Sequence, residues 1–456
     1  MTVDLVIKNA LIPIGTDLVA AGIAIDEGKI VSIAKESFLP RSSKNIDVNG
    51  NIVIPGCIDS HVHFRDPGAL EIEDFQTGTT AAACGGVTTV LDMPTNVPYV
   101  STISALDYKK GQIMSKALVD YGLYGGPDVS KLDEVRPLAD AGVIGYKIFM
   151  GTPGAYPQVP DDDNLLEAFR SVSATGLPTS VHAENWQIIK YYTEKLKKGG
   201  RKDALAHCEA RPEIAEIDAV SRALLLAEET GLRLHMAHMS TARAVCLIKE
   251  AKAAGLKVTA ETCPHYLLLD NSVMNKMGPY ARVNPPLRSK RDVSALWEAI
   301  MNGTIDILAS DHAPQLRENK EPGWQDIWAC KGGLVGVETM LPLMLTQVNA
   351  DRLSLGRVIQ IMSENPAKIF GLYPRKGVIQ VGADADFVVV NMKQELQLQE
   401  ERLHSKQKKT PFSGWGVKGV PILTMVRGQV VMKDGEVIGK PGSGMLLSSG
   451  PRARAN

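Results

Sequence analysis

The feature that most constrains the fold is a regular alternation of short apolar runs with longer stretches of helical composition between residues 53 and 376. Eight of these runs have the continuous apolar character of strands that are buried on both faces of a parallel sheet. They cover residues 57–64, 87–93, 119–126, 143–150, 177–184, 232–240, 256–266 and 305–312. Eight parallel strands, each followed by a helix, can close into a barrel. The alternation therefore predicts an α/β fold, with a (β/α)8 TIM-type barrel over residues 53–376.

Both ends of the chain instead show short strands with alternating polar and apolar residues, joined by hairpin turns. This pattern covers residues 4–7, 23–33 and 45–54, and it returns at 385–391 and 422–438. Since neither end has enough strands for a stable sheet of its own, we expect one small composite β-sandwich domain built from both termini, formed by residues 1–52 and 377–440. Residues 441–456 are rich in Gly, Ser and Arg, and we expect a loose C-terminal tail there.

The charge balance excludes several classes of partner. Among 456 residues, 50 Lys and Arg face 51 Asp and Glu, so the sequence predicts no nucleic-acid partner and no membrane surface patch. No apolar run approaches the roughly 18 residues of a membrane-spanning helix. The six cysteines are dispersed without a CxxC pair, and the start of the chain lacks the features of a signal peptide. These observations predict a cytoplasmic protein with reduced cysteines.

Side chains that commonly bind metals stand at the ends of the predicted barrel strands, where TIM barrels carry their active sites. His61 and His63 end the first strand, and alternation places both imidazoles on one face. His182 ends the fifth strand, His238 the sixth, and Asp311 the eighth. This distribution favours a metal site over a purely structural role for the histidines.

Two further polar residues lie on these strands. His235 is an odd number of residues from His238, so we expect it to face the opposite side and pack in the interior. Lys147 stands among apolar neighbours, where an unpaired charge is costly. Imidazole and carboxylate ligands suit zinc, and also manganese, iron or cobalt. Two cations about 4 Å apart would need a bridging anion, and carboxylation of Lys147 by CO2 is a step that the chemistry permits.

The complete set of motifs resembles the cyclic amidohydrolases of the amidohydrolase superfamily: hydantoinases, allantoinases, dihydropyrimidinases and dihydroorotases. The resemblance covers nearly the whole chain, from residues 4–9 through 55–63 to 382–386. It implies two divalent metal ions, a composite β-domain, and a homodimer or homotetramer. By this resemblance one ion is held by His61, His63 and Asp311, the other by His182 and His238, with carboxylated Lys147 as the bridge.

The resemblance also implies a reaction. One metal would polarise the carbonyl of a ring amide, and the pair would hold a bridging hydroxide that attacks it. Asp311 would be the catalytic residue that takes the proton and returns it to the departing ring nitrogen. A ligand without a proton role is the alternative for Asp311. A non-catalytic scaffold on the same fold is the alternative for the whole protein, but all six ligand positions are occupied, which favours an enzyme.

The substrate partner is expected to be a small cyclic amide or ureide, and the motifs divide over which one. Residues 63–68 and 284–288 are similar to dihydroorotases, in which an arginine, here Arg65, grips a carboxylate. Asn284 would be a substrate-binding amide. However, dihydroorotases usually have Asn where this chain has Thr95, and His where it has Gln315.

Residues 93–96, 261–266 and 320–324 look more like hydantoinases and allantoinases. Thr152 stands five residues after Lys147, where dihydropyrimidinases are expected to have a tyrosine, and this difference argues against that enzyme. We therefore expect hydrolysis of a five-membered cyclic ureide, with Arg65, Asn96 and Asn284 as substrate-binding residues and dihydroorotate as the alternative substrate. For Arg65, a salt bridge without a substrate role stays open.

Overall fold

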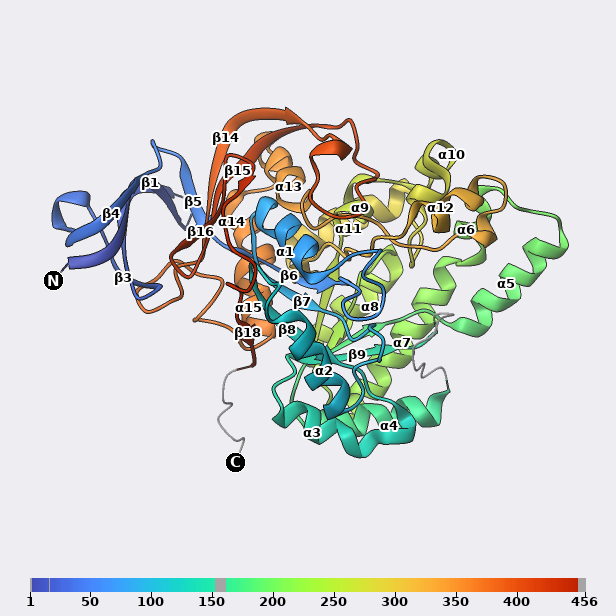
Figure 1. The fold of residues 1–456 in the computed structure, drawn as a ribbon. Coiled ribbons are helices and arrows are strands. Elements are labelled where there is room, and N and C mark those ends of the chain that lie inside the picture. Colours follow the sequence, from blue (N-terminus) through green and yellow to red (C-terminus); the bar gives the residue numbers. More distant parts are fainter. Residues whose placement is uncertain (1, 16, 152–160, 450–456) are drawn as a thin grey trace.

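The computed structural model describes residues 2–15, 17–151 and 161–449 of the chain, and its larger part is a barrel of parallel strands (Figure 1). Each strand of this sheet hydrogen-bonds to its neighbours in chain order. A bridge between Val62 and His312 joins the first strand to the segment after the last. The strands are β6 (Cys57–Val62), β7 (Val87–Asp92), β8 (Asp120–Gly125), β9 (Gly145–Phe149), β10 (Thr179–His182), β11 (Leu234–Met236), β12 (Val258–Thr262) and β13 (Ile307–Leu308). Every one lies within a predicted apolar run, so the predicted fold class is confirmed.

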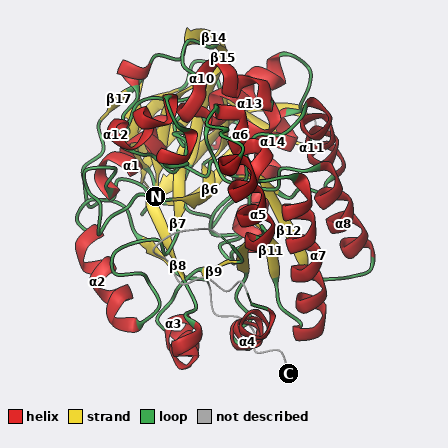
Figure 2. Ribbon diagram, turned by 90° about the vertical axis from the view of Figure 1, so that its right-hand side faces the viewer, coloured by secondary structure: helices red, strands yellow, loops and turns green. Residues whose placement is uncertain are grey.

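Helices surround this barrel (Figure 2). Helix α7 illustrates how they pack, because small buried residues such as Ala215, Ala219 and Ala223 line one face at helical spacing and allow close approach to the strands. The helices between the first and last barrel strands are α1 (Phe75–Cys84), α2 (Ile103–Ile113), α3 (Val135–Asp140), α4 (Asp162–Ser173), α5 (Trp186–Lys198), α6 (Ala204–Ala210), α7 (Glu213–Thr230), α8 (Ala242–Ala253), α9 (Pro264–Leu268), α10 (Met274–Met277) and α11 (Lys290–Asn302). After β13 follow α12 (Arg317–Lys320), α13 (Met340–Asn349), α14 (Leu355–Ile359) and α15 (Asn365–Ile369).

The two ends of the chain together build a second sheet, as predicted. Its strands are β1 (Thr2–Ile14), β2 (Asp17–Asp26), β3 (Lys29–Ala34), β4 (Arg41–Asp47), β5 (Ile52–Pro55), β14 (Phe387–Gln397), β15 (Gly416–Val426), β16 (Gln429–Lys433) and β17 (Glu436–Val437). They run in the order β17-β16-β15-β14-β5-β1-β2-β3, with β4 beside β1, so the expected sandwich is hydrogen-bonded into one sheet. Antiparallel pairing of β14 with β5 joins the two termini, and one apolar core includes both Ile23 and Phe387.

A buried cluster of charges connects this sheet to the barrel. Lys376 Nζ lies 2.5 Å from Asp120 at the start of β8, 2.6 Å from Asp386 and 3.0 Å from Asp384. Burial opposes the charge on Lys376, but Asp386, Asp120 and Asp384 raise the pKa of this ammonium above its usual 10.5. The two domains therefore share a network of paired charges rather than a purely apolar contact.

The prediction of a loose C-terminal tail differs from the structure over residues 441–449. Leu446–Leu447 forms strand β18, which pairs in parallel with β8, and Leu447 is fully buried. The backbone N–H of Met445 donates to Asp120. Composition suggested disorder, but the pairing of Leu446–Leu447 with β8 and the burial of Leu447 hold this segment against the barrel. Residues 450–456 lie outside the described residues. Within the described part of the chain, no helix is both long and apolar enough to cross a membrane.

Candidate metal centre and active site

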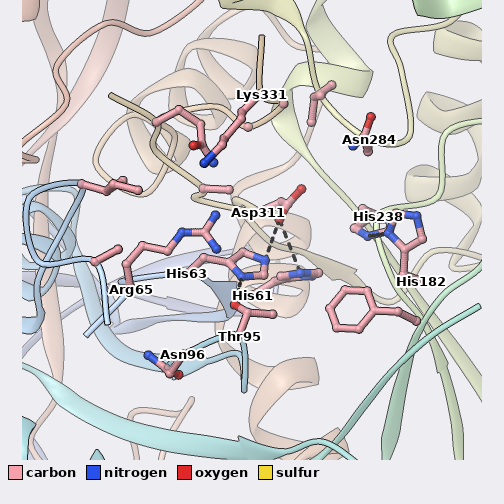
Figure 3. Close-up of a pocket in the computed structure, with 18 of the residues that line it drawn as sticks. His61, His63, Arg65, Thr95, Asn96, His182, His238, Asn284, Asp311 and Lys331 are labelled. Atoms are coloured by element: carbon pink, nitrogen blue, oxygen red, sulfur yellow. Dashed lines mark hydrogen bonds and ion pairs between the residues drawn. The ribbon is translucent and has the colours of Figure 1, made fainter. Parts of the chain in front are cut away.

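Three predicted ligands meet at the C-terminal mouth of the barrel. His61 lies on β6, His63 follows it directly, and Asp311 follows β13. Nε2 of each imidazole lies 3.4 Å from Oδ1 of Asp311, as the dashed lines in Figure 3 mark. One ligand atom from each residue lies within 4.8 Å of the others, and all three side chains are buried. The strand ends thus bring together residues that are 250 positions apart in sequence.

The other predicted ligands line the same cavity of about 520 Å³. His182 ends β10 and His238 follows β11, and their Nδ1 and Nε2 atoms lie 3.1 Å apart. Lys147 on β9 is fully buried. Within the described residues, Lys147 Nζ and His238 Nδ1 have no hydrogen-bond partner. All six predicted ligand residues therefore surround one space.

The sequence predicts that His238 ends the sixth strand, but in the structure it lies two residues beyond that strand. Strand β11 already ends at Met236, and His238 adopts a left-handed backbone conformation with a φ of 40°. Asp311 has a φ of 47°. Such conformations are unfavourable for residues other than glycine and concentrate at functional sites. His235 does not line the cavity, as expected, and instead contacts Thr259 and Glu261.

These residues fit a pair of divalent ions. Nitrogen and oxygen ligands about 2.0–2.1 Å from a zinc ion stand about 3.3 Å apart at a tetrahedral angle, close to the spacings of 3.1 and 3.4 Å. A fully buried ammonium that no hydrogen bond within the described residues satisfies is costly, and burial lowers the pKa of Lys147 to about 8. A modified, anionic Lys147 shared by two cations would remove this cost.

The protonation states also suit metal binding. Burial lowers the pKa of His63 to about 3 and that of His238 well below its usual value, so both imidazoles are neutral at pH 7. Burial opposes ionisation of Asp311, but His61 and His63 lower the pKa of this carboxyl to about 2. Neutral imidazoles and an ionised carboxylate are the forms that bind cations.

Several supporting residues were not predicted from the sequence. Glu261 on β12 lies 2.5 Å from His61 Nδ1 and also binds Ser60 and His235. Thr95 Oγ1 lies 2.7 Å from His63 Nδ1. Carboxylates and hydroxyls in such positions fix the orientation of metal-binding imidazoles. The sequence signals for Glu261 are an acidic residue inside a buried strand and its place at the start of the 261–266 motif, and neither indicates its partner His61.

A second carboxylate supports the other pair. Glu184 Oε2 lies 2.8 Å from His182 Nε2, and Arg211 binds the same carboxylate. Because Nε2 of His182 is engaged by Glu184, Nδ1 is the nitrogen that faces His238. Each histidine pair thus has its own buried acid, which the strand-end pattern alone does not reveal.

The predicted substrate-binding residues Arg65, Asn96 and Asn284 all line the cavity. The two asparagine amides differ in whether they are already hydrogen-bonded to the protein. Asn96 donates to the carbonyl of Asp66 at 2.9 Å and accepts from Lys109 at 2.6 Å, so its amide holds the neighbouring loop. Asn284 Oδ1 and Gln315 Oε1 have no hydrogen-bond partner within the described residues. Arg65 lies beside His63 in Figure 3. Thr152, which stands where dihydropyrimidinases are expected to have a tyrosine, lies outside the described residues.

The barrel, the composite sheet and this site together define an amidohydrolase. Residues 52–431 match the amidohydrolase family. An L-hydantoinase from Paenarthrobacter aurescens is 39% identical over 98% of both chains, and an allantoinase from Solibacter usitatus is 36% identical over 97% of this chain and 96% of its own. A dihydroorotase from Methanosphaera stadtmanae is 37% identical over 95% of this chain and 97% of its own.

The solved structures agree. One entitled "L-Hydantoinase (Dihydropyrimidinase) from Arthrobacter aurescens" superposes with a TM-score of 0.95 at 39% identity, covering 98% of this chain and 100% of the other. The chain therefore belongs to the amidohydrolase family. Within that family it is a cyclic amidohydrolase, and the resemblance stated from its motifs is confirmed.

Proposed function

We propose that the protein hydrolyses a ring C–N bond in a five-membered cyclic ureide of the hydantoin or allantoin type. The observation that carries the proposal is the convergence of six ligand-type side chains around one cavity of about 520 Å³. The similarity to an L-hydantoinase and to allantoinases over nearly the whole chain supports this choice of ring.

The proposal includes two divalent ions, zinc first, with manganese, iron or cobalt as alternatives. His61, His63 and Asp311 would hold one ion, and His182 and His238 the other. Carboxylated Lys147 would be shared. When bound, the ions would polarise the ring carbonyl and lower the pKa of the attacking water.

The protein's own groups would then position the ring and move protons. Asp311, ionised at neutral pH, can accept a proton from the attacking water and return it to the departing ring nitrogen. Asn284 and Gln315 both line the cavity, and the side-chain oxygen of each has no hydrogen-bond partner among the residues that the structure describes. A cyclic ureide presents N–H groups that would donate to these two oxygens. A ring without such N–H groups would leave the oxygens unpaired and would therefore bind less well.

Dihydroorotate is the second candidate substrate. It is favoured by Arg65, which lines the cavity beside His63 and could bind a carboxylate in a bidentate manner. Against it, the neutral amide of Gln315 occupies a position where dihydroorotases usually have an imidazole. We also expect the protein to act in the cytoplasm as a homodimer or homotetramer, which cell fractionation and analytical ultracentrifugation would test.

The test is a panel assay of hydantoin, allantoin, dihydrouracil and dihydroorotate with the metal-loaded protein. We expect turnover of a five-membered ureide, its loss after chelation and its return with zinc. Arg65→Ala is compared with Arg136→Ala, an exposed arginine paired with Asp140. Selective loss of dihydroorotate turnover in Arg65→Ala would support the second candidate. No turnover of any of the four rings by fully loaded protein would reject the proposed function.

A further inference from the structure

A second cluster of metal-ligand side chains lies outside the active-site cavity. Cys84 is the last residue of α1, Glu338 precedes α13, and His404 lies in the segment between β14 and β15. One possible ligand atom from each lies within 4.8 Å of the others. All three line a separate cavity of about 760 Å³, together with Glu436 from β17. Sulfur, nitrogen and oxygen donors from three distant segments thus meet at the junction of the two domains.

His404 is held in an orientation suited to metal binding. Its backbone N–H donates to Glu338 Oε2 at 2.8 Å, and its Nδ1 lies 2.9 Å from Oε1 of the same carboxylate. A proton on Nδ1 donated to Glu338 leaves the lone pair on Nε2. Metal-binding histidines commonly donate their other ring nitrogen to a carboxylate in this way.

The distance between the Cys84 sulfur and the free nitrogen of His404 also fits a shared metal ion. Nε2 of His404 lies 3.7 Å from Sγ of Cys84. A zinc ion about 2.3 Å from sulfur and about 2.0–2.1 Å from nitrogen keeps these two atoms about 3.6 Å apart at a tetrahedral angle. An ion could therefore enter between them with little movement of either side chain.

The surrounding charge favours a cation. The C-terminal end of α1 carries partial negative charge where Cys84 stands. Burial raises the pKa of the Cys84 thiol, and the carboxylates of Glu338 and Glu436 raise it further. Reactive cysteine nucleophiles need the opposite, an electropositive environment. The trio is thus better suited to hold a metal ion than to perform nucleophilic chemistry.

We propose that Cys84 Sγ and His404 Nε2 bind a transition-metal ion, zinc or a similar borderline-soft ion, at a site separate from the active site, and that Glu338 orients His404 through its Nδ1. Water molecules from the adjoining cavity would complete a tetrahedral set. The bound ion would fasten the segment carrying His404 to the barrel. That segment already contacts the barrel near the predicted ligand Asp311, because Ser405 donates to Glu73, which lies 3.4 Å from His312, the residue after Asp311.

Cobalt(II) provides a selective probe, because a thiolate ligand gives an intense near-ultraviolet charge-transfer band that imidazole and carboxylate ligands do not. The six active-site ligand positions include no cysteine. We expect wild-type protein titrated with Co²⁺ to show this band and to bind one more equivalent than Cys84→Ser. Cys246→Ser, which removes an exposed thiol, is the matched control and should keep both the band and the additional equivalent.

Glu338→Gln keeps the size of the side chain but removes its charge, and should weaken cobalt binding at this site by about 10–100-fold. If Cys84→Ser does not fold, as judged by its thermal transition, His404→Gln measures the same loss. Equal stoichiometry and equal band intensity in wild type and Cys84→Ser would overturn the proposal and leave a hydrogen-bonded trio without an ion. The band should persist in His61→Ala, so failure of the proposed function is distinguishable from failure of this site.

Discussion

Replacing Glu261 by glutamine tests whether the buried carboxylates under the histidines maintain metal affinity. Glu261 is fully buried, and its two oxygens lie 2.5 Å from His61 Nδ1 and 3.1 Å from His235 Nε2. A glutamine fits the same space but offers only one carbonyl oxygen and places an NH2 group against a donor. His61 would then lose either its hydrogen bond or the negative charge that increases its basicity as a ligand.

The expected size of the effect follows from these contacts. Loss of a carboxylate behind a metal-binding imidazole lowers metal affinity by about 10–100-fold, or about 1.4–2.7 kcal/mol. Hydrogen bonds to charged groups contribute about 1.5–3 kcal/mol each to stability, so the free energy of unfolding should also fall by about that amount. Only the loss of metal affinity is specific to the site.

The measurement is zinc affinity from competition with a chelator, combined with urea unfolding of the metal-free protein. Glu216→Gln is the matched control, because Glu216 is equally buried and accepts hydrogen bonds from Ser240 and Thr241 without touching a predicted ligand. Both variants should lose stability, and only Glu261→Gln should lose zinc affinity. Zinc affinity within twofold of wild type in Glu261→Gln would refute this role for the carboxylate.

Three other predictions concern the bridge, the domain junction and the C-terminal strand. Lys147→Ala should lose bound metal and turnover, both partly restored by a short added carboxylate, whereas restoration by metal alone would contradict a bridging role. Lys376→Met should destabilise the fold by about 3–5 kcal/mol at pH 7 in urea unfolding, because the buried carboxylate of Asp386 loses the ammonium 2.6 Å away, while Asp120 and Asp384 keep partners in Arg427 and Arg375. Burial raises the pKa of Asp384, but its cationic neighbours, Lys376 foremost, more than offset this effect, so the pKa of this carboxyl lies below its usual 3.8. The stabilisation that Asp384 gains from Lys376 is therefore present above pH 3.8 and is lost as the pH falls further. The deficit of the variant should therefore shrink in acid, and a constant deficit would argue against the ion pairs. Leu447→Ala should cost about 2–5 kcal/mol, while Ile438→Ala, at a side chain that is 54% exposed, should cost far less. Equal thermal shifts in these two variants would mean that β18 adds no stability.

The barrel and its predicted ligands could be read from the sequence because both depend on local patterns. A strand buried on both faces requires a continuous apolar run, and all residues of β6, β7 and β8 are buried. Parallel strands end at one mouth, so a polar residue at the end of a run enters a shared space. His61 and His182 follow this rule directly, since both still lie within a strand.

Residues on the connecting loops were less predictable. Asn96 belongs to a motif that suggested substrate contact, yet its amide is used by Lys109 and Asp66, and nothing in the motif indicates those partners. Leu447 docks on β8 although its neighbours have the composition of a flexible tail. Cys84 and His404 are 320 positions apart, and no periodicity connects them. Such contacts depend on the path of irregular backbone.

This division bears directly on the choice of substrate. The reacting groups lie at strand ends, whereas the side chains that would recognise a ring lie on connecting segments. Arg65 and Gln315 follow strands β6 and β13, and Asn284 lies between α10 and α11. Motifs on such segments can be shared between hydantoinases and dihydroorotases, because a loop can keep its residues and still redirect an amide. Availability of the amide in the folded state is the better criterion. By that criterion Asn284 and Gln315, whose oxygens have no partner within the described residues, should determine ring selection, and Asn96 should not.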